Sequence, residues 1–269
     1  MTEPVQELLA ILDGLDEAAI AVSGGIDSMV LATLSTSVAN RDFEIFHAVS
    51  PAVQRDGTAR VRRYAARYGW RLRVIDTGEF ADRNYLENPI NRCFYCKSNL
   101  YQAMRAQTGA AILSGTNASD LGDFRPGLQA ASDHGVRHPY VEAGIAKPEI
   151  RKIASDLALT DLAVLPAQPC LSSRVRTGIA ISPKLLEAIY RVEQHVQATL
   201  KPEVVRCRYA GDMVRVELDA ACLDALTDAD RTDVMRTVQQ AFAANGRTPE
   251  VAFSEYRMGS AFVHQAGPA

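Results

Sequence analysis

Two short stretches of the chain combine residue types that can do chemistry. The stretch SGGIDS, residues 23–28, joins the apolar run AAIAV to a helical pattern. Its glycines let the backbone approach an anion, while hydroxyls and free amides at a helix start supply donors beside the positive end of the helix dipole. The stretch PAQPCLSSR, residues 166–174, places Cys170 between a proline and two serines. The first stretch predicts a phosphate site; the second leaves open a metal ligand, a disulfide, a nucleophile or a consumed reagent.

The first half of the chain alternates β-rich runs with helical stretches. Strands are predicted at residues 18–23, 43–50, 71–77 and 110–116, and helices at about 26–38, 58–68, 97–107 and 147–159. This alternation predicts an α/β fold, with a parallel sheet flanked by helices on both faces. Ligands of such sheets collect at the carboxyl ends of the strands, where SGGIDS lies.

The alternation of predicted strands and helices ends at about residue 165. Residues 166–182 are rich in proline and small polar residues, which is typical of a linker or functional loop. Beyond them a helix is predicted at about 183–200, strands at 204–209 and 213–218, a helix at about 220–243 and a strand at 251–256. We therefore expect a nucleotide domain at 1–165, an active-site loop at 166–182 and a smaller C-terminal α+β domain at 183–269, for substrate binding or oligomerisation.

Bulk properties limit the class of protein. The 269 residues are 47% hydrophobic and 23% charged, an ordinary globular composition. A net charge of -3 gives no general attraction to nucleic acid or to an anionic membrane. No apolar run reaches the roughly 20 residues of a membrane span, and the acidic start MTEPVQELLA lacks the basic region of a signal peptide. We expect a cytoplasmic protein without nucleic-acid or membrane partners.

The five cysteines are an odd number in a chain too large to need disulfides, so they are predicted to be reduced thiols. Cys93 and Cys96 form the only close pair, and a closed zinc set of four ligands is not visible in the sequence. Packing in a loop is the simpler interpretation of that pair. The five histidines do not cluster, and none is predicted to bind a metal.

Several ordered motifs resemble one family. SGGIDS matches the SGGxDS signature of the PP-loop ATP pyrophosphatases, which cleave ATP to AMP and pyrophosphate; it lacks the endings of Walker and dinucleotide loops. CFYCKSNLY, SGTNASDLGDFRPGLQAA, EAGIAKPEIRKIA and PCLSSR together resemble the LarE-type ATP-dependent sacrificial sulfur insertases of nickel-pincer nucleotide cofactor biosynthesis. The resemblance covers about residues 18–218.

The resemblance implies a fold, ligands and partners. It implies a PP-loop domain followed by a smaller domain, with ATP and magnesium as cofactors and a pyridinium-3,5-dicarboxylate mononucleotide as substrate. It also implies a homo-oligomer, hexameric in known members, and contact with other nickel-pincer biosynthesis proteins. The family enzyme adenylylates the substrate carboxylate, attaches it to its own cysteine as a thioester and gives up the sulfur. Cys170 occupies that cysteine's position and would become dehydroalanine.

The family's functional residues carry over to two groups near the nucleotide. Ser23, Gly24, Gly25 and Ser28 would hold pyrophosphate, with Asp27 contributing to magnesium binding or loop geometry. The segment SGTNASDLGDFRPG, residues 114–127, resembles the GTNxDD segment of the superfamily. Its candidates for handling magnesium or the activated substrate are Asn117, Asp120, Asp123 and Arg125. In the simpler alternative Asn117 caps a helix and Asp120 is solvated.

A third group surrounds the cysteine. Ser173, Arg206 and Arg208 match positions that hold the substrate phosphate, and the two arginines alternate on one strand and therefore share a face. A surface ladder is the alternative. Arg174 would stabilise the thiolate, which is the competent nucleophile. The acidic residues that match a second divalent metal site near Cys170 are Glu193, Glu217 and Asp224, although a helical glutamate such as Glu193 is usually solvated.

Three rival interpretations remain. One variant of the family uses an iron-sulfur cluster held by three cysteines, which is disfavoured because Cys207 and Cys222 lack cluster-like spacing. A tRNA or small-molecule thiolase would use Cys93 and Cys96 as a persulfide relay, and Cys170 would keep its sulfur. A non-catalytic AMP-binding protein would bind nucleotide without releasing pyrophosphate.

Overall fold

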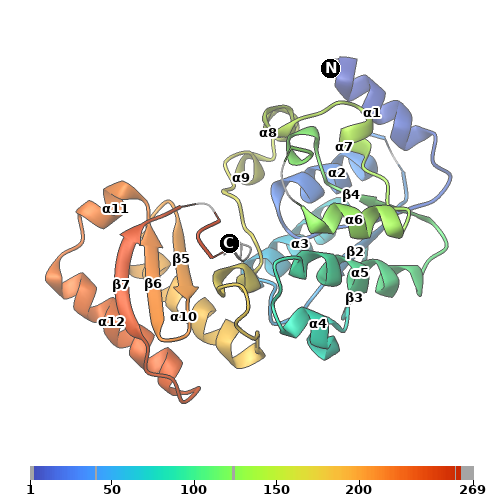
Figure 1. Cartoon of the computed structure of the whole chain (residues 1–269). Helices are drawn as coiled ribbons and strands as arrows, with labels where there is room; N and C mark the ends of the chain where they lie inside the picture. The colour runs from blue at the N-terminus through green and yellow to red at the C-terminus, as the bar shows by residue number, and fades with distance from the viewer. Residues whose placement is uncertain (1–2, 40, 123–124, 258, 262–269) are drawn as a thin grey trace. The chain divides into compact units, whose positions relative to one another are not determined.

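The computed structural model describes residues 3–39, 41–122, 125–257 and 259–261. The chain divides into two compact units (Figure 1). The first unit contains the described residues up to Glu79 and those from Asn91 to Gln168; the second contains Phe80–Ile90 and the described residues from Pro169 onward. The segment Phe80–Ile90 is thus separated in sequence from the rest of its unit.

The first unit is built on a four-stranded parallel sheet. Its strands are β1 (Ala18–Ala21), β2 (Glu44–Ala48), β3 (Arg71–Ile75) and β4 (Ala111–Ser114), in the order β3-β2-β1-β4. The four predicted strands all form, and the α/β prediction is confirmed. β1 and β2 are central, so the residues that follow β1 lie in the middle of the carboxyl edge of the sheet.

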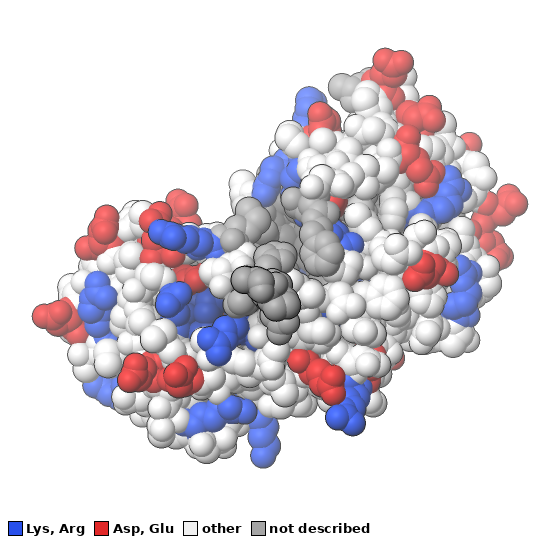
Figure 2. Space-filling view, viewed as in Figure 1, with Lys and Arg blue, Asp and Glu red and all other residues white. Residues whose placement is uncertain are grey.

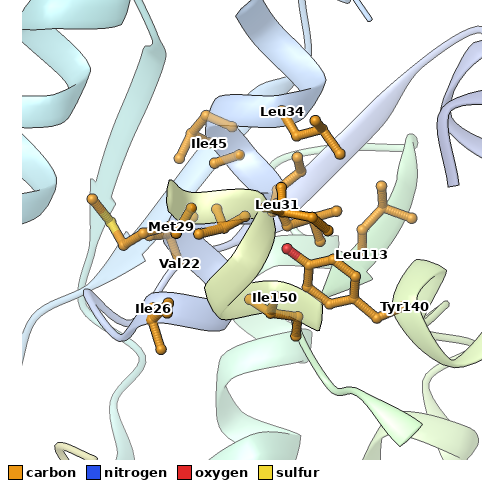
Figure 3. Close-up of a cluster of buried hydrophobic side chains, with 14 of the residues drawn as sticks. Val22, Ile26, Met29, Leu31, Leu34, Ile45, Leu113, Tyr140 and Ile150 are labelled. Carbon is orange, nitrogen blue, oxygen red and sulfur yellow. The ribbon is translucent and has the colours of Figure 1, made fainter. Parts of the chain in front are cut away.

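Helices cover both faces of this sheet, as the side-chain alternation of β1 requires. Ala18 and Ile20 pack into a core formed with α1 (Glu3–Asp13), α2 (Ile26–Ser37), α3 (Arg55–Tyr68), α7 (Pro139–Glu142), α8 (Lys147–Asp156) and α9 (Thr160–Ala163). Figure 3 shows part of this core, with Leu31 of α2 beside Tyr140. Ala19 and Ala21 pack into a second core against α5 (Arg92–Arg105) and α6 (Pro126–Asp133).

The helix α5 begins earlier than the sequence predicted. It starts at Arg92, so Cys93 and Cys96 lie in its first turns and not in a loop. The predicted loop position of this pair is wrong, because the helix extends five residues N-terminal of the expected start at Lys97. The five cysteines form no disulfide.

The second unit has a three-stranded sheet. Its strands are β5 (Val205–Tyr209), β6 (Met213–Leu218) and β7 (Glu250–Glu255); β5 and β6 are antiparallel and β6 and β7 are parallel. The long helices are α10 (Pro183–Thr199) and α12 (Asp228–Ala243), and the shorter ones are α4 (Arg83–Leu86) and α11 (Ala220–Asp224). Tyr209 of β5 stacks on Phe242 of α12 with ring centroids 5.5 Å apart, which places α12 on that face of the sheet.

The helix predicted at 220–243 is two helices, α11 and α12. Thr227 interrupts it, because its side chain accepts a hydrogen bond from the Asp230 amide at 3.1 Å. The Asp230 carboxylate accepts in return from the Thr227 amide at 3.0 Å. This reciprocal arrangement is a capping box, which starts a new helix at Asp228.

The segment Phe80–Ile90 belongs to the second unit because of Asn88. Its buried side-chain amide donates to the carbonyls of Arg176 and Ile179, each at 3.0 Å. The Ile181 amide donates to the Leu86 carbonyl at 2.8 Å, and the Tyr85 hydroxyl lies 2.7 Å from that of Ser172. These contacts across some ninety residues fix the part of the chain that follows Cys170.

Charges and helix lengths agree with the bulk composition. On the face seen in Figure 2, Lys and Arg are interspersed with Asp and Glu, as a net charge of -3 would suggest. Within the described ranges, each helix is too short or too polar to cross a bilayer.

Candidate active site

The SGGIDS segment forms a hydrogen-bonded turn between β1 and α2. The Ser23 amide donates to the Ser28 hydroxyl at 3.1 Å, and that hydroxyl donates to the Gly25 carbonyl at 3.2 Å. The Gly25 amide donates to the Ser23 hydroxyl at 3.3 Å. Gly25 is the N-cap of α2 and has no side chain with which to cap it. The amides of the first turn therefore suit an anion at the positive end of the helix dipole.

Gly24 is required by both conformation and space. Its φ is +87°, and a Cβ there would lie 2.8 Å from the Gly57 carbonyl oxygen of α3. Replacing Gly24 with alanine should therefore displace the turn and lower ATP affinity by about tenfold or more, because left-handed strain costs about 1–3 kcal/mol. Titration calorimetry with ATP and magnesium measures this loss. Gly109→Ala is the control, since a Cβ there meets no atom within 4 Å; equal affinities for both variants would contradict the prediction.

Gly115, in the SGTN segment after β4, allows a second close approach to the same turn. A Cβ at Gly115 would lie 2.7 Å from the Ser28 amide nitrogen and 2.9 Å from the Asp27 carbonyl carbon. The backbone that follows β4 therefore packs directly against the first turn of α2.

Asp27, predicted to assist magnesium binding, forms an ion pair with Lys147. The Lys147 ammonium lies 2.6 Å from each carboxylate oxygen, and both side chains are partly exposed. The buried Tyr140 hydroxyl donates to the Asp27 backbone carbonyl at 3.1 Å, and burial raises the Tyr140 pKa far above its usual value. The Asp27 carboxylate of the SGGIDS turn thus has a partly exposed ammonium as its partner.

The candidates after β4 gather in one cluster. The Asn117 side chain accepts from the Ser119 amide at 3.0 Å and donates to the Asp120 carboxylate at 3.1 Å. Arg125 forms an ion pair with the same carboxylate at 2.9 Å. Asn117 therefore caps the short 3-10 helix at Ala118–Asp120, as the simpler alternative supposed. Asp123 lies outside the described residues, and the ligand roles of this cluster stay predictions.

His47 is hydrogen-bonded to the residue that precedes the SGGIDS turn. It is fully buried, with Nδ1 2.8 Å from the Val22 carbonyl and Nε2 2.9 Å from the Thr58 hydroxyl. A carbonyl can only accept, so Nδ1 carries the proton and Nε2 accepts from Thr58. Burial lowers the pKa of His47, outweighing the hydrogen bond to Val22, and favours the neutral ring.

This neutral histidine makes stability depend on pH. Near and below the unfolded-state pKa of about 6.5, the unfolded chain binds a proton at His47 that the folded protein does not. The free energy of unfolding therefore decreases as the pH is lowered through this range. From pH 7.5 to pH 5.5 the free energy of unfolding should decrease by up to about 1.4 kcal/mol more in the unmodified protein than in His47→Gln. Urea unfolding at the two pH values measures this difference. Burial also lowers the pKa of His138, but this histidine is present in both proteins and affects the pH dependence of both equally. Equal decreases in the free energy of unfolding of the two proteins would contradict the assignment to His47.

In the second unit, Cys170 precedes the short 3-10 helix Leu171–Arg174 and is partly exposed. Its carbonyl oxygen accepts from the Ser173 amide at 3.0 Å, the Ser173 hydroxyl at 2.7 Å and the Arg174 guanidinium at 3.2 Å. The Pro169 carbonyl accepts from Arg174 at 2.8 Å. These bonds fix the backbone on both sides of the thiol. Ser173, predicted to bind phosphate, uses its hydroxyl in this network.

Arg174 and Glu193 form a buried bidentate pair. Arg174 Nε and Nη2 donate to the two carboxylate oxygens at 2.9 and 3.0 Å, and the side chains are 1% and 7% exposed. Burial acts to lower the pKa of Arg174, but the Glu193 charge outweighs it and raises it. Glu193 also accepts from the Cys207 amide at 2.9 Å. The pair thus connects the cysteine loop, α10 and β5.

The two predicted phosphate-binding arginines are both mostly buried. Arg208 Nε donates to Glu217 at 2.9 Å and its Nη1 donates to the Ser173 carbonyl at 2.9 Å. Arg206 lies over the Tyr256 ring, 5.5 Å from its centroid, and burial together with the Arg174 charge lowers its pKa. Ser173, Arg206 and Arg208 therefore lie in one unit, with Arg208 in direct contact with Ser173.

Two of the acidic residues predicted to bind a second metal are each paired with an arginine. Glu193 pairs with Arg174, and Glu217 pairs with Arg208 and accepts from the Ser260 hydroxyl at 2.6 Å. Asp224 lies at the end of α11. Over the part of the chain that the structure describes, no group of three or more His, Cys, Asp or Glu side chains is arranged to hold a metal. The second metal site stays a prediction.

Comparison with known proteins identifies relatives along most of the chain. An uncharacterised protein of Synechocystis sp. is 35% identical over 218 residues, covering 80% of this chain and 81% of that protein. The pyridinium-3,5-bisthiocarboxylic acid mononucleotide synthase of Lactiplantibacillus plantarum is 28% identical over 232 residues, covering 84% of this chain and 83% of the synthase. The chain belongs to the LarE-type family. An uncharacterised protein of Methanocaldococcus jannaschii is 26% identical over 204 residues, covering 74% of this chain and 77% of that protein, and no protein-family model matches.

Sequence reasoning missed several residues of this LarE-type site. Lys147 had a detectable signal, because a lysine at the first position of a helix opposes the helix dipole and so indicates a nearby anion. His138, whose Nδ1 lies 2.8 Å from the Ser114 hydroxyl at the end of β4, had none. Arg60 was predicted only as part of a basic helix, yet it is 9% exposed and hydrogen-bonded to the Gly24 carbonyl.

Proposed function

We propose that this chain is an ATP-dependent sulfur insertase that converts a carboxylate of a pyridinium-3,5-dicarboxylate mononucleotide into a thiocarboxylate. The observation that carries the proposal is the match over 84% of the chain to the Lactiplantibacillus plantarum synthase, whose name states a bisthiocarboxylic product. The partly exposed Cys170 in its rigid loop supports the proposal, because a thiocarboxylate needs a sulfur donor.

Activation of the carboxylate is assigned to the first unit. A substrate carboxylate oxygen attacks the α-phosphate of ATP, forming an acyl-adenylate and releasing pyrophosphate to the amides of the SGGIDS turn. Asp27 would hold magnesium through its carboxylate oxygens, the ligand type this ion prefers, and the ion would neutralise phosphate charge. Lys147, released from Asp27, would then be a cation available to the phosphates.

Sulfur transfer is assigned to Cys170. Its thiolate attacks the acyl carbon, AMP leaves and a thioester forms. A base then removes the Cys170 α-proton, the electron pair forms the bond between Cα and Cβ, and the bond between Cβ and sulfur breaks. The products are a thiocarboxylate and a dehydroalanine at position 170, so each chain supplies one sulfur.

The other cysteines of the second unit are poorer sulfur donors. Cys207 is fully buried, and burial raises its pKa far above the usual value; the Glu193 charge acts in the same direction. Burial and Asp219 also raise the pKa of Cys222. Both thiols therefore stay protonated at neutral pH and are weak nucleophiles. Among the cysteines of the second unit, Cys170 is therefore the favoured sulfur donor.

Intact-protein mass spectrometry tests the proposal. The protein is incubated with ATP, magnesium and the dicarboxylate mononucleotide, and its mass is compared before and after. We expect loss of one hydrogen sulfide, mapped by peptide analysis to Cys170, together with AMP and pyrophosphate. Many turnovers with Cys170 unchanged would favour a thiolase using Cys93 and Cys96. Nucleotide binding without pyrophosphate release would favour a non-catalytic AMP-binding protein.

A further inference from the structure

Arg60 of α3 joins two segments that the proposed reaction uses at different steps. Its side chain is largely buried, and Nη1 donates both to the Gly24 carbonyl at 2.7 Å and to the Gln168 side-chain oxygen at 2.9 Å. Both acceptors are neutral. The nearby Asp161 carboxylate instead pairs with Arg63 at 2.8 Å and accepts from Tyr64. A buried charge directed at two neutral oxygens is costly, which indicates that its position matters.

The first contact controls the orientation of the phosphate turn. The Gly24 carbonyl and the Gly25 amide belong to one planar peptide unit and point in opposite directions. By holding the carbonyl oxygen, Arg60 sets the direction of the Gly25 amide, which now donates to the Ser23 hydroxyl. A bound phosphate is a stronger acceptor than that hydroxyl. Its arrival would turn the peptide and thereby change the bond between Gly24 and Arg60.

The second contact lies at the start of the cysteine segment. Gln168 is exposed and is the last residue of the first unit. Cys170 follows two residues later, and two residues of chain span at most about 7 Å. One guanidinium nitrogen therefore connects the phosphate turn to the chain immediately before the thiol. A change in the position of Arg60 would alter this bond to the Gln168 side chain.

We propose that Arg60 and Gln168 form a coupling link through which nucleotide in the SGGIDS turn sets the position of Cys170. Arg60 and Gln168 are positioning residues, because neither donates sulfur nor receives the acyl group. The link makes the thiol respond to whether a triphosphate or its products occupy the turn. The purpose, ordering sulfur transfer after adenylylation, rests on the proposed function, whereas the link itself requires only nucleotide binding.

Alkylation of Cys170 tests the link without the sulfur substrate. The full chain is treated with iodoacetamide, with and without saturating α,β-methylene-ATP and magnesium, and each cysteine is quantified by peptide mass spectrometry. In the unmodified protein the nucleotide should change the Cys170 rate by about fivefold, while Cys222 responds less. In Gln168→Ala the change at Cys170 should disappear. Gln168→Glu keeps an oxygen that can accept from Arg60 and should retain the response.

Two controls separate the link from general damage. Gln107→Ala, another exposed glutamine of the first unit, should behave as the unmodified protein. Nucleotide affinity, measured by calorimetry, should stay within about twofold in Gln168→Ala, because Gln168 does not contact the phosphate turn itself. Arg60→Lys keeps the charge but lacks the planar fork, and it should lose the response.

The alkylation results either support or overturn the coupling link. The coupling link is overturned if bound nucleotide leaves Cys170 alkylation unchanged in the unmodified protein, or if Gln168→Ala responds as strongly. A nucleotide response that depends on Gln168, in a protein that never loses sulfur with the dicarboxylate nucleotide, would support the link and refute the sulfur insertase. If sulfur is lost, single-turnover kinetics of Gln168→Ala should show pyrophosphate release unchanged and sulfur loss about tenfold slower.

Discussion

Replacing Cys170 with alanine should leave pyrophosphate release intact and abolish thiocarboxylate formation. In the proposed reaction adenylylation uses the SGGIDS turn of the first unit, whereas alanine at position 170 has no sulfur to attack the acyl carbon. Thiocarboxylate output should therefore fall to the uncatalysed background, a larger loss than removal of a general acid or base, which costs about 10²- to 10⁴-fold. Single-turnover assays that follow pyrophosphate and thiocarboxylate in parallel measure both quantities.

Cys222→Ala is the matched control for this variant. Cys222 is also a partly exposed cysteine of the second unit, and its raised pKa makes it a weak nucleophile. This control should form product at the rate of the unmodified protein. Normal thiocarboxylate output from Cys170→Ala would place the sulfur source elsewhere, and the pair Cys93 and Cys96 would be examined next.

Glu193→Ala should lower the free energy of unfolding by about 3–5 kcal/mol, because it leaves the Arg174 guanidinium buried without its counter-charge. The same change removes the acceptor of the Cys207 amide. Arg174 holds the carbonyls of Pro169 and Cys170, so the loop around the thiol should loosen as well. Urea unfolding gives the stability, and protease cleavage near Cys170 reports the loosening.

A paired replacement distinguishes a buried charge from a general packing defect. Replacing Arg174 with methionine together with Glu193 by leucine removes both charges and keeps apolar volume, so much of the lost stability should return. Arg191→Ala, an exposed change on the same helix, should cost less than about 0.5 kcal/mol. If the double variant is less stable than Glu193→Ala, the buried charge is not the cause.

Local patterns predicted the parts of the structure that depend on neighbouring residues. Apolar runs placed β1 to β4, and the glycines of SGGIDS placed a turn between β1 and α2. Contacts between distant residues were not predictable in this way. The pairing of Arg174 with Glu193, nineteen positions apart, depends on how α10 packs, and a helical glutamate is solvated more often than buried. The metal role of Glu193 came from the family resemblance and stays a prediction.

Some features were visible in the sequence but were not used. The Asp230 that follows Thr227 by three residues is a capping-box pattern, and it would have divided the helix predicted at 220–243. By contrast, nothing in residues 80–90 indicates that they belong with the second unit. Their assignment follows from Asn88, whose amide reaches carbonyls some ninety residues later.

That arrangement has a consequence for synthesis of the chain. Residues 80–90 emerge from the ribosome long before their partners, so Tyr85 and Asn88, 1% and 0% exposed in the finished protein, cannot be buried until the cysteine segment has been made. A fragment ending at Gln168 should therefore be cleaved by protease within residues 80–90, where the full chain resists. The second unit contains residues made early and residues made late in translation, so it can complete its folding only after the C-terminal residues have been synthesised.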